Sequence, residues 1–205
     1  MSLTANRHSS QNVGMLTRLW CWCGIVLFCL LGAWSAGVWS AERSRISLLQ
    51  IQADQGALYL NAEIELVLPD VVQEALHKGI ALHFNASAEI ERVRWYWFDA
   101  VDAQESKSVR LTFQPLLQRY RVTIGGLGQT FATLPEALNF VGHISHWRIA
   151  DADVLNSSGD KKLVFIFELD RSRLPRLFQV GVADQEEWGL SLKQEVDLQI
   201  SGDGQ

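Results

Sequence analysis

The stretch 57–68 reads ALYLNAEIELVL, and its apolar residues fall on every second position. Leu58 opens the apolar series, and the positions between include Asn61, Glu63 and Glu65. Successive side chains of a strand point to opposite faces of a sheet, so this period of two places the apolar residues on one face. The stretch therefore predicts a strand with one buried and one solvent-facing side.

The same alternation recurs along the rest of the chain. Six further segments carry it, namely 46–53, 80–90, 109–113, 120–124, 163–169 and 188–200. The link at 114–118 has the length of a hairpin connection, which favours antiparallel pairing. The phase slips by one residue at Arg92 and Val93, which predicts a bulge or bend there. We expect an α+β, mainly antiparallel β fold of about seven strands, arranged as a sandwich or as a curved sheet.

Two segments show helical signals instead of alternation. The first covers residues 69–78 and is followed by Gly79, a residue type that often ends a helix. The second covers about residues 133–146, where Thr133 and Glu136 have the spacing of a capping box. These segments predict two short amphipathic helices.

The composition limits the class of protein. The 205 residues are 48% hydrophobic and 10% aromatic, which is typical of a globular protein and excludes a disordered or multi-span membrane protein. The 23 acidic residues exceed the 18 Lys and Arg residues, and a net charge of -5 argues against nucleic acid as a partner. No linker divides the body, so we expect the polar stretch 151–162 to be a loop inside a single domain.

The first 41 residues have the features of a membrane segment. No charge occurs between Arg18 and Glu42, and residues 19–41 would span about 34 Å as a helix. Arg7 and Arg18 precede this segment and every acidic residue follows it, which favours a cytoplasmic N-terminus and an exported body. We expect a cytoplasmic tail at 1–18, a signal-anchor or transmembrane helix at 19–41, and a periplasmic β-rich domain at 42–205.

A cleaved secretory signal is the alternative for this segment. The apolar stretch 20–31 and the small residues at 32–37 also fit a signal peptide, with 38–40 as a tolerable cleavage site. A retained anchor is favoured because tryptophans stand at both ends of the segment, at Trp20, Trp22, Trp34 and Trp39. The prediction is a single-pass inner-membrane protein of a Gram-negative envelope, with a secreted periplasmic form if the leader is cleaved.

The body carries no pattern that predicts catalysis, a metal site or a cofactor. All three cysteines, Cys21, Cys23 and Cys29, lie in the leading segment, and hydrolase, metalloprotease and phosphate-loop motifs are missing from the sequence. His143 and His146 are three residues apart near the expected end of a helix and could reach one metal ion. No third ligand is evident, and a histidine in the last turn is also favoured by the helix dipole.

Acidic pairs and arginines give two further hypotheses. Glu63/Glu65 and Glu89/Glu91 share a strand face and could act as acid and base, although solvated strand faces carry the same pattern. Arginines that could face anionic lipid head groups or an acidic partner are Arg92, Arg94, Arg110, Arg119, Arg121, Arg171, Arg173 and Arg176.

The most unusual hexamer is RWYWFD at 94–99, in which four aromatic residues follow one another. Exposed rings beside an Arg and an Asp could stack on a sugar or an apolar peptide and add directional hydrogen bonds. The alternative is that the tryptophans fill the core and the outer rings shield the edge of the sheet.

Several short motifs of this sequence occur together in one protein family. They are LP at 68–69, EALxKGI at 74–80, RWYWxD at 94–99, YRV at 120–122, TLPEAL at 133–138 and LPxxFQV at 174–180. With them, the body from about residue 46 to 200 resembles the proteobacterial family described as domain of unknown function 4390. The resemblance implies an exported, often membrane-anchored protein linked to a sensor kinase, and it supplies no catalytic residues. The candidate binding surface comprises Arg94, Trp95, Tyr96, Trp97, Asp99, Arg121, Phe178 and Gln179.

The sequence favours a non-catalytic protein-interaction module over two alternatives. In this hypothesis one helix tethers the domain to the inner membrane, and the domain binds an envelope protein such as the outer part of a sensor. The first alternative is a carbohydrate- or lipid-binding domain that uses Trp95, Tyr96 and Trp97. The second is a cell-wall hydrolase, which would need two carboxylates about 5 to 9.5 Å apart in a cleft.

Overall fold

The computed structural model describes residues 43–94, 99–175 and 188–198. The chain divides into two compact units, 1–41 and 42–205, and the described residues all belong to the second. The predicted membrane segment at 19–41 therefore lies outside the described residues. Within the described ranges, no helix combines the length and the apolar character needed to cross a membrane.

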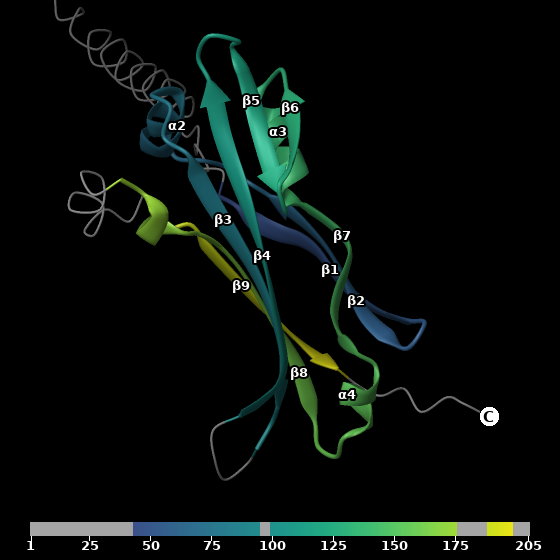
Figure 1. Ribbon diagram of the computed structural model, residues 1–205. Coiled ribbons are helices and arrows are strands. Elements are labelled where there is room, and N and C mark those ends of the chain that lie inside the picture. The colour runs from purple at the N-terminus through teal and green to yellow at the C-terminus, as the bar shows by residue number, and fades with distance from the viewer. Residues whose placement is uncertain (1–42, 95–98, 176–187, 199–205) are drawn as a thin grey trace, which may run out of the picture. The chain divides into compact units, whose positions relative to one another are not determined.

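The described residues form nine strands in two antiparallel sheets (Figure 1). The smaller sheet has the order β1-β2-β7, with β1 at Arg45–Asp54, β2 at Ala57–Glu65 and β7 at His143–Asp151. The larger sheet has the order β6-β5-β4-β3-β8-β9. Its strands are β3 (Leu82–Arg92), β4 (Ala100–Gln114), β5 (Arg119–Ile124), β6 (Leu127–Phe131), β8 (Lys161–Leu169) and β9 (Ser191–Leu198). The predicted β-rich, antiparallel fold is confirmed.

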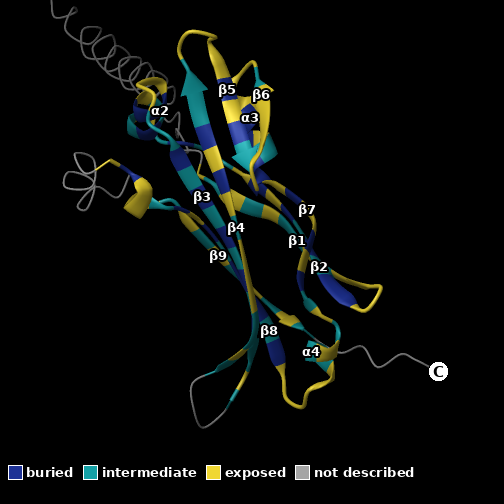
Figure 2. Cartoon of the chain, in the orientation of Figure 1, coloured by how far each residue is buried: buried dark blue, intermediate teal, exposed yellow. Residues whose placement is uncertain are grey.

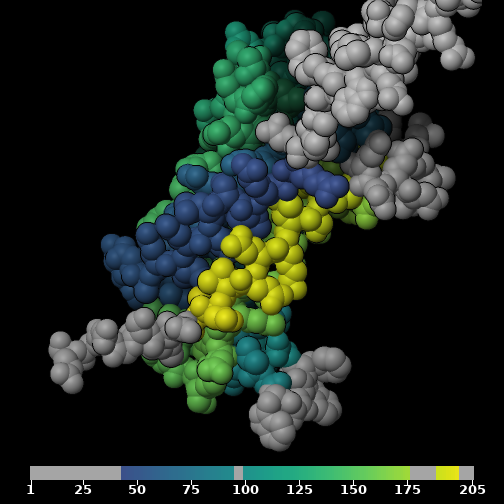
Figure 3. Space-filling view, turned by 180° about the vertical axis from the view of Figure 1, so that it is seen from behind, coloured from purple at the N-terminus to yellow at the C-terminus, as the bar shows by residue number. Residues whose placement is uncertain are grey.

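The two sheets face each other across one hydrophobic core. Leu60 of β2, Phe84 of β3 and Phe165 of β8 are completely buried in this core. Figure 2 shows buried and partly exposed residues alternating along β3, as the period of two predicts. At the sides of the core β7 lies near β4 and β1 lies near β9, and Figure 3 shows the latter pair in blue and yellow. The strands thus form a sandwich.

Both predicted helices are present. Helix α2 spans Asp70–His77, and the amide of Gly79, which has a φ of +88°, donates to the carbonyl of Leu76 at its end. Helix α3 spans Leu134–Gly142. Its start is capped because Thr133 Oγ1 accepts a hydrogen bond from the amide of Glu136 at 3.4 Å. Two shorter turns of helix complete the described part, α4 at Asp153–Asn156 and the 3₁₀ segment η1 at Arg171–Arg173.

The prediction of about seven strands was wrong, because β6 and β7 were missed. Residues 143–146 belong to β7 and not to the end of a helix, since α3 already ends at Gly142. In β7 the backbone of His146 has a φ of +47°, and its amide donates to Asn61 Oδ1 at 2.8 Å. This irregularity disturbs the period of two: the buried residues of β7 are Ile144, Trp147 and Ile149.

Two other expected boundaries also differ. The expected loop at 151–162 contains α4 and ends inside β8, whose first residue, Lys161, is 3% exposed. The expected irregularity at Arg92 and Val93 lies slightly earlier in the structure. β3 ends at Arg92, and the register of β3 and β4 shifts between Ile90 and Glu91.

Candidate interaction site at the end of the large sheet

The hexamer at 94–99 lies in the connection between β3 and β4. The structure describes its two ends, Arg94 and Asp99, whereas residues 95–98 lie outside the described residues, as do Phe178 and Gln179. The structure therefore describes the stem of this connection and not Trp95, Tyr96 and Trp97. This stem consists of the ends of β3 and β4 and the neighbouring start of β8.

Ion pairs join the stem on the outer face of the large sheet. Lys162 Nζ lies 2.8 Å from Asp99 Oδ2, 3.2 Å from Glu91 Oε2 and 3.8 Å from Glu195 Oε2. The other carboxylate oxygen of Asp99 accepts a hydrogen bond from the amide of Arg94 at 3.2 Å. This outer network of Glu91, Asp99, Lys162 and Glu195 connects both ends of the hexamer to β8 and β9.

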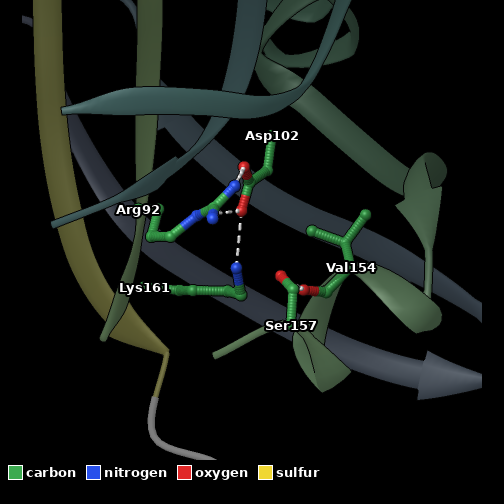
Figure 4. A network of polar contacts seen from close by, with 5 residues as sticks. All are labelled: Arg92, Asp102, Val154, Ser157 and Lys161. Atoms are coloured by element: carbon green, nitrogen blue, oxygen red, sulfur yellow. Dashed lines mark hydrogen bonds and ion pairs between the residues drawn. The ribbon is translucent and has the colours of Figure 1, made fainter. Parts of the chain in front are cut away.

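A second network joins the same strands on the core side. Where the register of β3 and β4 shifts, Asp102 is the additional residue of β4, as in a β-bulge. Its carboxylate binds the guanidinium of Arg92 from β3 and, at 2.5 Å, Nζ of Lys161 from β8 (Figure 4). The Lys161 side chain is only 1% exposed and that of Asp102 is 11% exposed. We call Arg92, Asp102 and Lys161 the inner network.

The charges in both networks stabilise each other. Hydrogen bonds from Arg92 and Lys161 lower the pKa of the Asp102 carboxyl from 3.8 to about 2. The hydrogen bond from Lys162, followed by that from the Arg94 amide, lowers the pKa of Asp99. Asp99 and Glu91 in turn raise the pKa of the Lys162 ammonium. These groups therefore remain charged at neutral pH.

The depressed pKa of Asp102 predicts acid sensitivity of the folded domain. Its ion pairs stabilise the fold fully above the ordinary pKa of 3.8, and this stabilisation is lost as the pH falls through about 2. The loss attributable to Asp102 is about 2 kcal/mol. Urea unfolding of the detergent-solubilised chain between pH 5 and 2, followed by tryptophan fluorescence, measures it. Other carboxylates add their own pH dependence, so the prediction is wrong if wild type and Asp102→Asn have parallel curves.

A cleft of about 440 Å³ opens beside the inner network. Its lining comes from β4, β7 and α4 and comprises Asp102, Ala103, Gln104, Glu105, Arg148, Ile149, Ala150, Asp151 and Val154. Figure 4 shows Val154 and Ser157 of this region next to the Asp102–Lys161 pair. One wall of the cleft thus carries an ionised carboxylate that two cations already neutralise.

Apolar side chains are exposed close to the stem. Val93 is 45% exposed and Val101 is 53% exposed, and both are among the few large hydrophobic residues that the described chain exposes. Val101 pairs with Glu91, which places it on the outer face beside Lys162. The stem therefore combines a charged network with exposed apolar side chains.

Arg121 was predicted to belong to the candidate binding surface, but the structure places it far from Arg94 and Asp99. It lies on β5 opposite Thr112, near the end of β4, whereas Asp99 precedes the first residue of β4. The length of β4 between them corresponds to roughly 40 Å. The structure brings Arg94 and Asp99 together and does not bring Arg121 to them.

Of the other residues considered for chemistry, Glu63 and His143 lie opposite each other on β2 and β7, and Glu91 belongs to the outer network. His143 and His146 are exposed on β7, and His146 stacks on Tyr59 with ring centroids 3.9 Å apart. Glu63 is exposed on β2, and Glu89 accepts a hydrogen bond from Gln104 at 2.7 Å. Within 43–94, 99–175 and 188–198, no group of three or more His, Cys, Asp or Glu residues could hold a metal ion.

Sequence reasoning singled out Glu91, Arg92 and Asp99 but missed the residues that pair with them in the two networks. Lys161 and Lys162 were assigned to a loop, and Asp102 was not singled out. One signal was present, since Lys161 continues the alternation of buried residues from Leu163 to Leu169 backwards by one step. A charged side chain at such a core-facing position of a strand requires a partner of opposite charge.

The fold and the site define a class of protein. It is an antiparallel β-sandwich domain in which ion pairs join the strand ends on either side of the connection between β3 and β4. The profile of the family described as Domain of unknown function (DUF4390) matches residues 41–197, and the chain belongs to this family. The family resemblance of the sequence motifs is therefore confirmed. Searches of the curated proteins and of the solved structures each found no match.

Proposed function

We propose that this chain is a membrane-anchored, exported interaction module that binds an envelope protein through residues 93–101. The apolar segment at 19–41, with arginines before it and every acidic residue after it, supports the anchor and the export. The four successive aromatic residues at 95–98 support a binding role, because aromatic side chains are enriched at the centres of protein interfaces.

The observation that carries this proposal is the pair of ion networks at the stem. The outer network joins Asp99 to Lys162, and the inner network joins Asp102 to Lys161. Together they tie β3, β4 and β8 to one another on both faces of the sheet. A binding segment whose ends are already fixed loses less conformational entropy when it binds.

The partner would meet a mixed apolar and charged surface. Val93 and Val101 supply exposed apolar area, and the outer network beside them supplies charges of both signs. Such a surface suits a folded protein with an apolar patch and a polar rim. The outer domain of a membrane-bound sensor kinase is the partner that we favour, and the role is one of contact and not of catalysis.

The outer network gives the test of this site. Lys162→Met removes the cation that holds Asp99 and Glu91, while Lys193→Met removes a lysine of β9 that pairs with Glu195 at 2.7 Å and not with Asp99. Chemical cross-linking in intact cells, with identification by mass spectrometry, compares both variants with wild type at equal protein level. We expect Lys162→Met to lower the yield of the partner adduct at least about fivefold, equivalent to roughly 1 kcal/mol of binding.

Lys193→Met should retain the wild-type yield. Equal adduct yields in Lys162→Met and wild type would contradict the proposed site. Adducts with cell-wall glycan or lipid in place of a protein would favour the alternative of a carbohydrate- or lipid-binding domain. Turnover of a substrate by the purified chain would contradict a non-catalytic role.

Export and anchoring have separate tests. A phosphatase that is active only outside the cytosol, fused to the C-terminus, is expected to be active. The mature protein should keep its full electrophoretic size, whereas loss of about forty residues would show a cleaved leader and a secreted periplasmic product.

A further inference from the structure

The turn between β4 and β5 exposes two adjacent leucines. Leu116 is 99% exposed and Leu117 is 65% exposed. The turn itself is well defined, because the amide of Leu117 donates to the carbonyl of Gln114 at 3.2 Å and Gln118 Nε2 donates to the carbonyl of Pro115 at 2.7 Å. These bonds hold the leucines at the tip of the hairpin, where nothing in the described part of the domain covers them.

Basic residues lie directly behind this tip. Arg119 pairs with Gln114 and Arg121 pairs with Thr112, so both arginines lie on the same face of β5. Both are exposed, and neither forms an ion pair among the described residues. An apolar tip followed by cationic side chains is typical of surfaces that lie in the head-group region of an anionic bilayer.

The chain enters the domain at the same end as this tip. Ser44 Oγ accepts a hydrogen bond from the amide of Val67 at 2.9 Å, just before α2. His77, at the end of α2, hydrogen-bonds the hydroxyl of Tyr120 at 2.7 Å, and Tyr120 is the second residue of β5. Figure 1 shows α2 and the β4–β5 turn at the upper end of the sandwich.

The expected membrane segment ends close to this point along the chain. Residues 42 and 43 alone separate Ala41 from Ser44, and these three Cα–Cα steps span at most about 11 Å. If the anchor of the proposed function is retained, the connection keeps this end of the domain near the bilayer.

We propose that the turn at 115–118 lies against the periplasmic surface of the inner membrane. Leu116 and Leu117 enter the boundary between head groups and acyl chains, and Arg119 and Arg121 contact lipid phosphates. The inference depends on the anchor of the proposed function. The stem, at the other end of β4, would then face away from the membrane and towards a protein partner.

Site-specific photo-cross-linking of the full chain tests this inference. The photoreactive residue p-benzoyl-phenylalanine replaces either Leu116 or Val101, which is also exposed but lies near the start of β4. The protein is reconstituted into vesicles of phosphatidylethanolamine and phosphatidylglycerol, irradiated and analysed by intact-protein mass spectrometry. We expect lipid adducts at least about tenfold more abundant from position 116 than from position 101. Arg119→Gln with Arg121→Gln should lower the yield at position 116.

Equal lipid yields at the two positions would overturn the inference, and so would adducts at 116 that consist only of a second copy of the chain. Retention of the wild-type chain in membranes after alkaline carbonate extraction separates the two proposals. If the chain is extracted, the anchor of the proposed function fails. If it is retained and position 116 finds no lipid, only the present inference fails.

Discussion

Asp102→Asn is expected to lower the free energy of unfolding by about 2 to 3 kcal/mol. Asp102 is the carboxylate that the ammonium of Lys161 contacts, and the Lys161 side chain is 1% exposed. An asparagine retains the shape but removes the charge, so the variant leaves a buried cation without an opposite charge. Urea unfolding of the detergent-solubilised chain at neutral pH measures the loss.

Removing the lysine instead provides a matched control. In Lys161→Met the carboxylate of Asp102 keeps Arg92 as a partner, and the methionine occupies a buried position of β8 that suits an apolar side chain. We therefore expect a smaller loss, on the order of 1 kcal/mol. The double variant with both changes should be more stable than Asp102→Asn alone. A free energy of Asp102→Asn within about 0.5 kcal/mol of wild type would contradict a structural role for the inner network.

Gly142→Ala is expected to cost a similar amount, about 3 kcal/mol or more. A Cβ at this position would lie 2.2 Å from the carbonyl oxygen of Ile64 in β2. The obstacle is backbone of the smaller sheet, so either β2 or the end of α3 must move. The same unfolding measurement tests this prediction.

Gly128→Ala is the matched control for this change. There the atoms nearest to a Cβ would be those of the Arg121 guanidinium, at 2.6 to 3.0 Å, and this exposed side chain can rotate away. We expect a change within about 0.5 kcal/mol. If Gly142→Ala were as mild as Gly128→Ala, the close contact between α3 and β2 would be wrong.

Strands with one well-covered face could be predicted from the sequence. β2 from Leu58 onwards and β3 from Leu82 to Glu91 alternate between buried and more exposed residues, since one side of each faces the core and the other faces solvent. β6 could not be found in this way, because Leu127 to Thr130 are all exposed and Phe131 is only half-buried. Without a buried face, an edge strand leaves no period of two in the sequence.

β7 could not be recognised from the sequence because its backbone is irregular. The positive φ of His146 shifts the alternation, so the buried residues Ile144 and Trp147 are three positions apart. Together with Val141 they have the spacing of a helix face, so the start of β7 looks like a continuation of the helix.

The site was predictable only where its residues are adjacent in the sequence. The hexamer drew attention to Arg94 and Asp99, and the structure joins them through a hydrogen bond from the Arg94 amide. The partners Lys161 and Lys162 come from a strand about sixty positions further along the chain. Their pairing with Asp99 and Asp102 depends on β3 lying between β4 and β8, which no local pattern reveals.

A photoreactive residue at position 101 in living cells tests the central claim most directly. Val101 lies beside the paired strand ends that carry the aromatic hexamer, and Leu127, 83% exposed in β6, serves as the control position. We predict one defined adduct with an envelope protein from position 101 and none with that protein from position 127. The same products from both positions, or no protein adduct from position 101, would contradict the claim that this end of the large sheet is a contact site.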